Sequence, residues 1–305
     1  MASAQMEASK EMMRGMMARG LAPRFDGCID PDRLRAVVQT AQERMPSEPG
    51  VSFHPCDLGG IEAEQSLPDK AGDSAVILYI HGGGLICGNA RTSRGYASLL
   101  AGETKLPVYS ISYRLAPEHP YPAALDDCFA AYKALLERHP GLPIFLIGES
   151  GGAYLSIVTA LRARDEGLTV PAGIIPYSPP IDFSGAIDRD FPGNRDFTVS
   201  PNGLNSLTDL YCRDPELVRT PYVSPYYADF AGMPPMLLAW DESESLAPDS
   251  ECLRDRARAA GVEVQAKSYP DCFHAFATGG RGTPESLEVL QDTVAFIHRH
   301  AKPKA

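Results

Sequence analysis

The chain has 305 residues, of which 44% are hydrophobic and 22% charged, as is typical of a globular enzyme with ample core material. Its formal net charge of −11 argues against nucleic acid or an anionic membrane as a partner, because both are bound through clustered Lys and Arg. No apolar run of about 18 residues predicts a transmembrane helix, and the length suits one large α/β domain with an insertion, or two small domains.

The chain begins with two predicted helices, over residues 5–19 and 30–44. Methionines recur through the first at roughly helical spacing, and Asp30 followed by Pro31 is a pattern that starts a helix. Charged residues interrupt residues 1–17, which therefore lack the unbroken apolar region of a signal peptide. We expect packing helices, or flexible Met side chains that line an adaptable acyl pocket. The two interpretations are compatible if the helices cover an active site.

Beyond residue 50 the sequence alternates predicted strands with predicted helices. Short apolar runs bounded by Gly and Pro indicate buried strands. The predicted strands are 51–58, 61–67, 75–80, 108–113, 143–147, 172–178, 236–240 and 262–269, and the predicted helices are 123–138, 153–161, 203–211, 249–260 and 284–298. This alternation predicts an α/β fold with a mostly parallel sheet and right-handed crossovers. The proline-rich residues 179–235 are interpreted as an insertion over the sheet edge.

Residues 148–152 read Gly-Glu-Ser-Gly-Gly and lie between a predicted strand and a predicted helix. The pattern Gly-x-Ser-x-Gly at such a junction is typical of a nucleophile elbow. Gly148 and Gly152 would leave room where the two backbones come close. The backbone N–H of Gly151 would point at an oxyanion formed beside Ser150. Taken alone, the motif also fits a chance occurrence in a Gly-containing turn.

A serine nucleophile needs a base, which follows it in the chain of such enzymes and is held by a carboxylate. The histidines after Ser150 are His274, His298 and His300. The last two are expected in a charged, solvated C-terminal tail. His274 directly follows the last predicted strand, which predicts a position at the carboxyl end of the sheet, beside the serine. We interpret it as the base, although a histidine flanked by Phe is often structural.

A second glycine-rich loop, His81–Gly84, follows the predicted strand 75–80. Its three glycines let backbone N–H groups approach a substrate, as one half of an oxyanion hole does. A phosphate-binding loop or a flexible turn is the alternative. Phosphate binding is disfavoured, since no Lys-Ser/Thr follows and no G-x-G-x-x-G pattern fits. We interpret His81 as a structural hydrogen-bonding residue.

Five segments together resemble the hormone-sensitive-lipase family of α/β-hydrolase esterases. They are His81–Gly84, Tyr113–Glu118, Gly148–Gly152, Ser224–Tyr226 and Tyr269–Phe276. The resemblance extends over residues 75–300 in the family's order and spacing. It implies an α/β-hydrolase fold with a mostly parallel eight-stranded sheet flanked by helices. It also implies a catalytic domain at 46–305 under a helical cap, formed by residues 1–45 and by an insertion before the seventh strand, about 179–230.

The same resemblance implies hydrolysis of short-chain, acetyl-type carboxylic esters without metal or cofactor. Ser150 would be the nucleophile and His274 the base, and the amides of Gly83, Gly84 and Gly151 would bind the oxyanion. The partner would be a small-molecule ester, and a homodimer through an edge strand or the last helix is a further expectation. Seven cysteines without C-x-x-C spacing predict reduced thiols in a cytoplasmic protein, without a zinc site.

The acid of this triad has three candidates in residues 241–246, which read Asp-Glu-Ser-Glu-Ser-Leu. The family usually has Asp-x-Leu there, and counting back from His274 without gaps places Glu244 at the acid position. Asp241 and Glu242 are the alternatives if the loop takes another register. Three carboxylates so close together would repel one another and raise at least one pKa.

Other motif residues are expected to be structural. The resemblance implies that Arg114 and Glu118 hold the loop after the fourth strand, and Glu149 occupies a position often taken by Asp. Two other functions fit the fold: a receptor-like protein that binds a small ligand without catalysis, and an amidase or peptidase. Receptors of this family lack the catalytic histidine, so the presence of His274 argues against the first, whereas the second needs the same triad.

Overall fold

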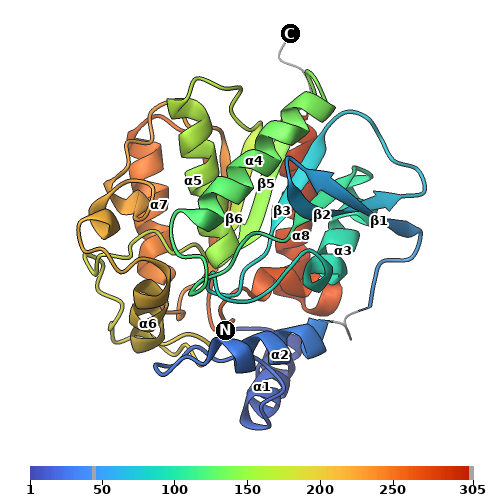
Figure 1. The fold of residues 1–305 in the computed structure, drawn as a ribbon. Helices are drawn as coiled ribbons and strands as arrows, with labels where there is room; N and C mark the ends of the chain where they lie inside the picture. The colour runs from blue at the N-terminus through green and yellow to red at the C-terminus, as the bar shows by residue number, and fades with distance from the viewer. Residues whose placement is uncertain (43–45, 302–305) are drawn as a thin grey trace.

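The computed structural model describes residues 1–42 and 46–301. Its centre is an eight-stranded sheet in the order β1-β2-β4-β3-β5-β6-β7-β8 (Figure 1). The strands are β1 Val51–Leu58, β2 Ile61–Pro68, β3 Val76–Ile80, β4 Val108–Ile111, β5 Ile144–Glu149, β6 Gly173–Tyr177, β7 Met236–Asp241 and β8 Val264–Tyr269. Only the pairs β1·β2 and β2·β4 of this sheet are antiparallel. The predicted α/β fold with a mostly parallel sheet is confirmed.

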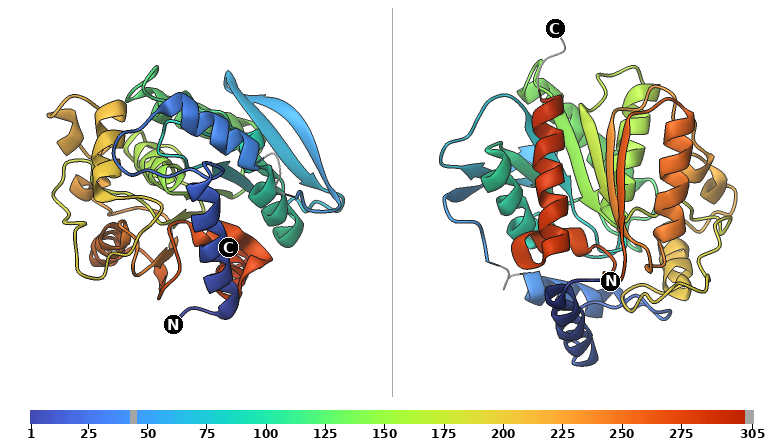
Figure 2. Two further views of the ribbon diagram at one scale, coloured as in Figure 1. Left: turned by 90° about the horizontal axis from the view of Figure 1, so that it is seen from below. Right: turned by 180° about the vertical axis from the view of Figure 1, so that it is seen from behind.

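Helices lie on both faces of the sheet. The α-helices of the described residues are α1 Ala4–Ala18, α2 Pro31–Gln42, α3 Arg94–Thr104, α4 Ala123–Arg138, α5 Gly151–Asp165, α6 Pro201–Tyr211, α7 Ala247–Ala259 and α8 Pro284–His300. Figure 2 shows the ribbon from two further sides, with helices packed against the sheet. One buried apolar cluster joins the sheet to α4, α5 and α7, and a second joins its other face to α3 and α8. Such two-sided coverage is typical of parallel sheets.

The position of β5 in the centre of the sheet explains why its sequence is a continuous apolar run. Successive side chains of a strand point to opposite faces of the sheet. Ile144 and Leu146 accordingly belong to one buried cluster, and Phe145 and Ile147 belong to the other. Burial on both faces therefore requires an apolar residue at each of these positions.

Two of the expectations need correction. No helix was expected over α3, whose Gly95 and Gly102 each weaken an isolated helix by about 1 kcal/mol relative to Ala. Burial of most of the helix against the sheet stabilises it instead. His298 and His300 belong to α8 rather than to a tail; His298 is exposed, as expected, whereas the His300 ring lies 4.6 Å from that of Phe296.

The helix expected over residues 30–44 is α2, and Asp30 caps it by accepting a hydrogen bond from Arg33 N at 3.1 Å. Positions 43 and 44 lie outside the described residues, as do the expected boundary at residue 45 and the end of the domain at residue 305. Within the described residues, no helix has both the length and the apolar character that a membrane crossing requires.

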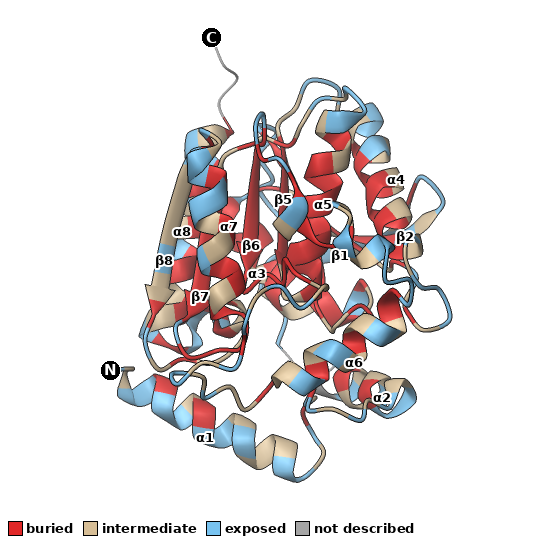
Figure 3. Cartoon of the chain, turned by 90° about the vertical axis from the view of Figure 1, so that its left-hand side faces the viewer, coloured by how far each residue is buried: buried red, intermediate tan, exposed pale blue. Residues whose placement is uncertain are grey.

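The helices α1, α2 and α6 lie together along one edge of the sheet, at the bottom of Figures 1 and 3. A short bridge joins the N-terminal segment to the segment before α6. Phe25 N donates to Thr198 O at 2.8 Å, and Ser200 N donates to Phe25 O at 2.8 Å. Two parts of the chain that are far apart in sequence thus meet at this edge.

Candidate active site

Ser150 lies at the sharp turn between β5 and α5. Its backbone has φ 53° and ψ −122°, a conformation that costs a residue other than Gly on the order of 1–3 kcal/mol. Its N–H donates to Tyr177 O at 2.9 Å, which holds the turn against β6. A Cβ on Gly152 would lie 1.9 Å from Ile80 O, and one on Gly148 would lie 2.5 Å from the Gly152 backbone. Both positions therefore require glycine.

The loop after β3 brings the predicted oxyanion glycines next to this turn. Gly83 and Gly84 have φ of 101° and 62°, and a Cβ on Gly83 would lie 2.3 Å from Cys87 O. A Cβ on Gly151, at the start of α5, would lie 3.2 Å from Leu85 N, so the loop and the helix are in contact. Within the described chain, the amides of the three predicted glycines donate no hydrogen bond. They are available to a substrate oxygen.

Glu149 ties the two halves of this arrangement together. Its Oε1 accepts a hydrogen bond from Gly82 N at 2.7 Å, and its Oε2 accepts one from the hydroxyl of Tyr79. Burial raises the pKa of Glu149 to about 7, against the opposing effect of these two donors. From the sequence, this residue was only a variant of the elbow motif, and no feature of the motif indicates the contact with the glycine-rich loop.

His274 and Glu244 form a buried pair. His274 Nδ1 lies 2.8 Å from Glu244 Oε2, and the two side chains are 8% and 0% exposed. Burial alone lowers the pKa of His274, but the hydrogen bond and charge of Glu244 outweigh it, so the pKa lies above its usual value. Within the described residues, His274 Nε2 has no hydrogen-bond partner, and this atom remains available as a base.

The two other carboxylates of the acid loop are engaged elsewhere. Asp241 accepts hydrogen bonds from Cys272 N at 2.9 Å and from the Ser243 hydroxyl at 2.7 Å. Glu242 accepts one from the Ser268 hydroxyl at 2.8 Å. Neither carboxylate hydrogen-bonds to the histidine, whereas Asp241 fixes the backbone of the loop that carries it.

A loop of the insertion before β7 holds the residue after Glu244. Ser245 N donates to Asp196 Oδ2 at 3.0 Å, and the Ser245 hydroxyl donates to Val199 O at 2.7 Å. Asn194 Nδ2 donates to the same hydroxyl at 3.0 Å. The insertion therefore helps to position Glu244, and no motif in the sequence indicates this contact.

The residues expected to be structural have such contacts. The His81 ring stacks on Tyr113 with centroids 4.2 Å apart, and burial lowers the pKa of His81 to about 4, so its ring is neutral. Arg114 Nη2 lies 2.6 Å from Asp127 Oδ1, which ties the loop after β4 to α4. Glu118 Oε2 lies 2.6 Å from Arg35 Nη2 of α2.

Two cavities meet at Ser150. The larger, which we call the His274 cavity, has about 240 Å³ and is lined by Ser150 and His274 together with Met13, Val38 and Val199. The smaller, which we call the small cavity, has about 20 Å³ and lies on the side of Gly84, Gly151 and α6. The serine and the histidine thus share one space, although no hydrogen bond joins them among the described atoms.

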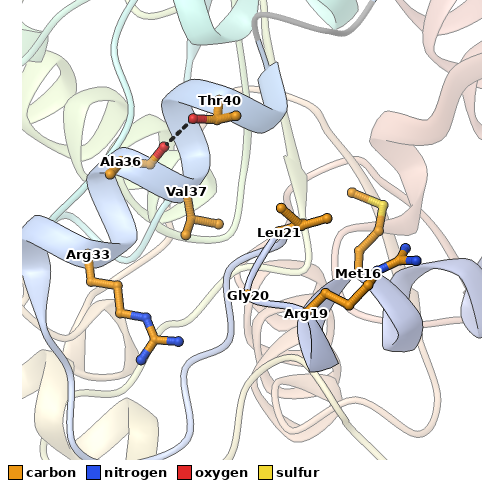
Figure 4. Close-up of a pocket in the computed structure, with 8 residues that line it drawn as sticks. All are labelled: Met16, Arg19, Gly20, Leu21, Arg33, Ala36, Val37 and Thr40. Atoms are coloured by element: carbon orange, nitrogen blue, oxygen red, sulfur yellow. Dashed lines mark hydrogen bonds between the residues drawn. The ribbon is translucent and has the colours of Figure 1, made fainter.

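A further hollow, of about 570 Å³, lies between α1 and α2 (Figure 4). Met16, Leu21 and Val37 line it, and Arg19 and Arg33 flank them. None of the predicted catalytic residues lines this hollow. No group of three or more His, Cys, Asp or Glu side chains within residues 1–42 and 46–301 is arranged to hold a metal ion.

The fold and this arrangement of side chains define the class of α/β hydrolases. A family model for the alpha/beta hydrolase fold matches residues 77–278. An esterase of Acinetobacter venetianus is 32% identical over 272 residues, covering 88% of this chain and 89% of the relative. An acetyl-hydrolase of Streptomyces hygroscopicus is 32% identical over 247 residues, covering 79% of this chain and 80% of the relative.

A solved structure of a hormone-sensitive lipase from a metagenome library superposes with a TM-score of 0.86 at 34% identity, covering 95% of this chain and 98% of that one. The chain belongs to the hormone-sensitive-lipase family of α/β hydrolases. It is a serine-dependent carboxylic ester hydrolase.

Proposed function

We propose that this carboxylesterase hydrolyses short-chain, acetyl-type esters with Ser150 as nucleophile, His274 as general base and Glu244 as the acid. The observation that carries the proposal is the 2.8 Å contact between His274 Nδ1 and Glu244 Oε2, beside a cavity that His274 shares with Ser150. A carboxylate at Nδ1 fixes the tautomer that leaves Nε2 free to accept the serine proton.

In the proposed mechanism, Ser150 Oγ attacks the ester carbonyl carbon while its proton passes to His274 Nε2. The resulting oxyanion accepts hydrogen bonds from the amides of Gly83, Gly84 and Gly151. Collapse of the tetrahedral intermediate breaks the bond to the alcohol, which leaves with the proton from the histidine. Water then attacks the acyl-enzyme with the same proton transfers, releasing the acid and restoring the serine.

The small cavity beside Ser150 supports a preference for acetyl-type acyl groups. With a volume of about 20 Å³, this cavity accommodates roughly one water-sized group, such as a methyl. Leu204 and Leu207 of α6 close this side. The acetyl-hydrolase of Streptomyces hygroscopicus bears a name that agrees with this preference.

The proposal includes a cap over a catalytic domain that begins near residue 46. The cap would comprise α1, α2 and residues of about 179–230. Its support is the lining of the His274 cavity, to which α1 contributes Met13, α2 contributes Val38 and the insertion contributes Val199. A cytoplasmic location and a homodimer stay predictions from the sequence.

The test is turnover of p-nitrophenyl acetate by the purified wild-type protein and by Ser150→Ala. Wild-type turnover and its loss in a variant with an unchanged circular dichroism spectrum and melting temperature would support the proposal. Near-normal turnover by Ser150→Ala would overturn the assignment of the nucleophile. No turnover by the wild type, with saturable binding of the ester, would favour the receptor-like alternative.

A further inference from the structure

The two cavities at Ser150 differ in whether His274, the residue that must protonate the leaving alcohol, lines them. General acid catalysis requires the leaving oxygen to lie within hydrogen-bond reach of His274 Nε2. His274 lines the larger of the two cavities and does not line the small cavity. The alcohol part of the ester therefore extends into the His274 cavity, and the acyl part occupies the small cavity.

The His274 cavity adjoins a third cavity, of about 590 Å³, which we call the methionine cavity. Met13, Pro23, Phe273, Ala275 and Thr278 line both. The methionine cavity alone is within the range of about 300–1,000 Å³ that small-molecule sites occupy. The space on the alcohol side of the serine is thus many times larger than the space on the acyl side.

The chemistry of these walls is apolar. Within the described residues, three ionisable side chains line the His274 cavity: His81, Glu149 and His274. Among the same residues, the lining of the methionine cavity contains no charged residue. Met12, Met13 and Met16 of α1 form one wall of the methionine cavity. Burial of apolar ligand surface against this wall would favour binding.

The helix α1 is held in a way that keeps this wall in place. Ser3 donates from its backbone and its hydroxyl to Glu285, at 2.6 and 2.8 Å. Lys10 Nζ donates to Asp271 O at 2.8 Å, in the loop that carries the histidine. These contacts fix the first half of α1, whereas Met12, Met13 and Met16 follow in the second half. Unbranched Met side chains adjust to ligands of different shape.

We infer that the natural substrates are esters of a small acyl group with a bulky apolar alcohol, and that the alcohol lies along the methionine face of α1. The inference rests on the proposed function, because it takes Ser150 and His274 as the reacting groups. It assigns the methionines to recognition of the alcohol rather than to the acyl pocket suggested by the sequence.

Two isomeric esters test this assignment: hexyl acetate and ethyl hexanoate, which share one composition and exchange the long chain between the alcohol and the acyl side. We expect kcat/KM, measured in a pH-stat, to be at least tenfold higher for hexyl acetate. A smaller ratio, or failure of both esters while p-nitrophenyl acetate is hydrolysed, would overturn the inference and leave the proposed function intact. Failure of p-nitrophenyl acetate would instead contradict the proposed function.

A variant of α1 links the preference to the proposed wall. Met13→Trp would fill the methionine cavity where it joins the His274 cavity, because Met13 lines both. We expect the ratio of kcat/KM for hexyl acetate to that for ethyl acetate to fall at least fivefold. Glu11→Gln is the matched control, because Glu11 is exposed on the same helix and lines neither cavity. An unchanged ratio in Met13→Trp, or an equal fall in Glu11→Gln, would overturn the assignment of the alcohol to this wall.

Discussion

Glu149 Oε1 accepts a hydrogen bond from Gly82 N at 2.7 Å, and this contact joins the serine turn to the glycine-rich loop. The donors proposed for the oxyanion come from both segments, so their spacing depends on this contact. Glu149 lies next to the proposed nucleophile, and we expect it to act as a positioning residue.

Replacement of Glu149 tests this positioning role. We expect Glu149→Ala to lower kcat for p-nitrophenyl acetate by about 10- to 100-fold with a smaller change in KM, because loss of a whole oxyanion donor costs on the order of 10²–10³. Glu149→Gln retains an acceptor oxygen and should restore most of the rate. Wild-type kcat in the alanine variant would show that the contact does not position the loop.

The buried Glu149 also predicts a dependence of stability on pH. Its pKa of about 7 lies above the ordinary 4.5, so the folded state retains a proton in this window that the unfolded state has lost. The free energy of unfolding contributed by this group therefore falls as the pH rises from 4.5 to 7. Relative to Glu149→Gln, the wild type should lose on the order of 3 kcal/mol between pH 4.5 and 8. Urea unfolding of both proteins measures this difference, and a constant difference would contradict the prediction.

Glu244→Gln separates the role of the acid from that of its neighbours. The carboxylate raises the pKa of His274, so its loss should move the acidic limb of the kcat/KM profile to lower pH. The rate should fall by about 10²- to 10⁴-fold, since the histidine loses the partner that orients it. Glu242→Gln is the matched control, because the Glu242 carboxylate accepts a hydrogen bond from Ser268 of β8. An equal loss in the control would refute the assignment.

Gly83→Ala tests the predicted oxyanion loop. The added Cβ would lie 2.3 Å from Cys87 O, so the loop must shift and its amide would no longer face the substrate oxygen. We expect a loss of kcat on the order of 10²–10³ in esterase assays. Gly15→Ala, where a Cβ meets nothing within 4 Å, should retain the wild-type rate. Full activity of Gly83→Ala would remove this glycine from the site.

Leu204→Ala tests whether the small cavity limits the acyl chain. Shortening this side chain of α6 widens the cavity, and kcat/KM for ethyl hexanoate relative to ethyl acetate should rise by about tenfold. Leu210→Ala is the matched control on the same helix, because Leu210 packs against the core away from the cavity. An unchanged acyl-chain profile in Leu204→Ala would argue that another part of the protein sets the limit.

The sheet could be predicted from the sequence because buried strands between Gly and Pro are strong local signals. α3 could not, since its stability comes from packing against residues distant in the chain rather than from its own composition. The serine turn was predictable for a steric reason, because Gly148 and Gly152 must lack a Cβ.

The acid of the site could be predicted only as a choice among three carboxylates. The turn of the loop decides which of them meets His274, and a hydrogen bond from Cys272 N engages Asp241 instead. The contact of Ser245 with Asp196 was not predictable, because it joins loops 49 positions apart without a sequence motif.

In the proposed mechanism, Ser150 carries the acyl group during turnover. Rapid quenching of the enzyme during p-nitrophenyl acetate hydrolysis, followed by peptide mass spectrometry, tests it most directly. We expect one acetyl group on the peptide that contains Ser150, assigned to this serine by fragmentation and absent from His274→Ala. Acetylation of another residue in the wild type, with Ser150 unmodified during active turnover, would contradict it.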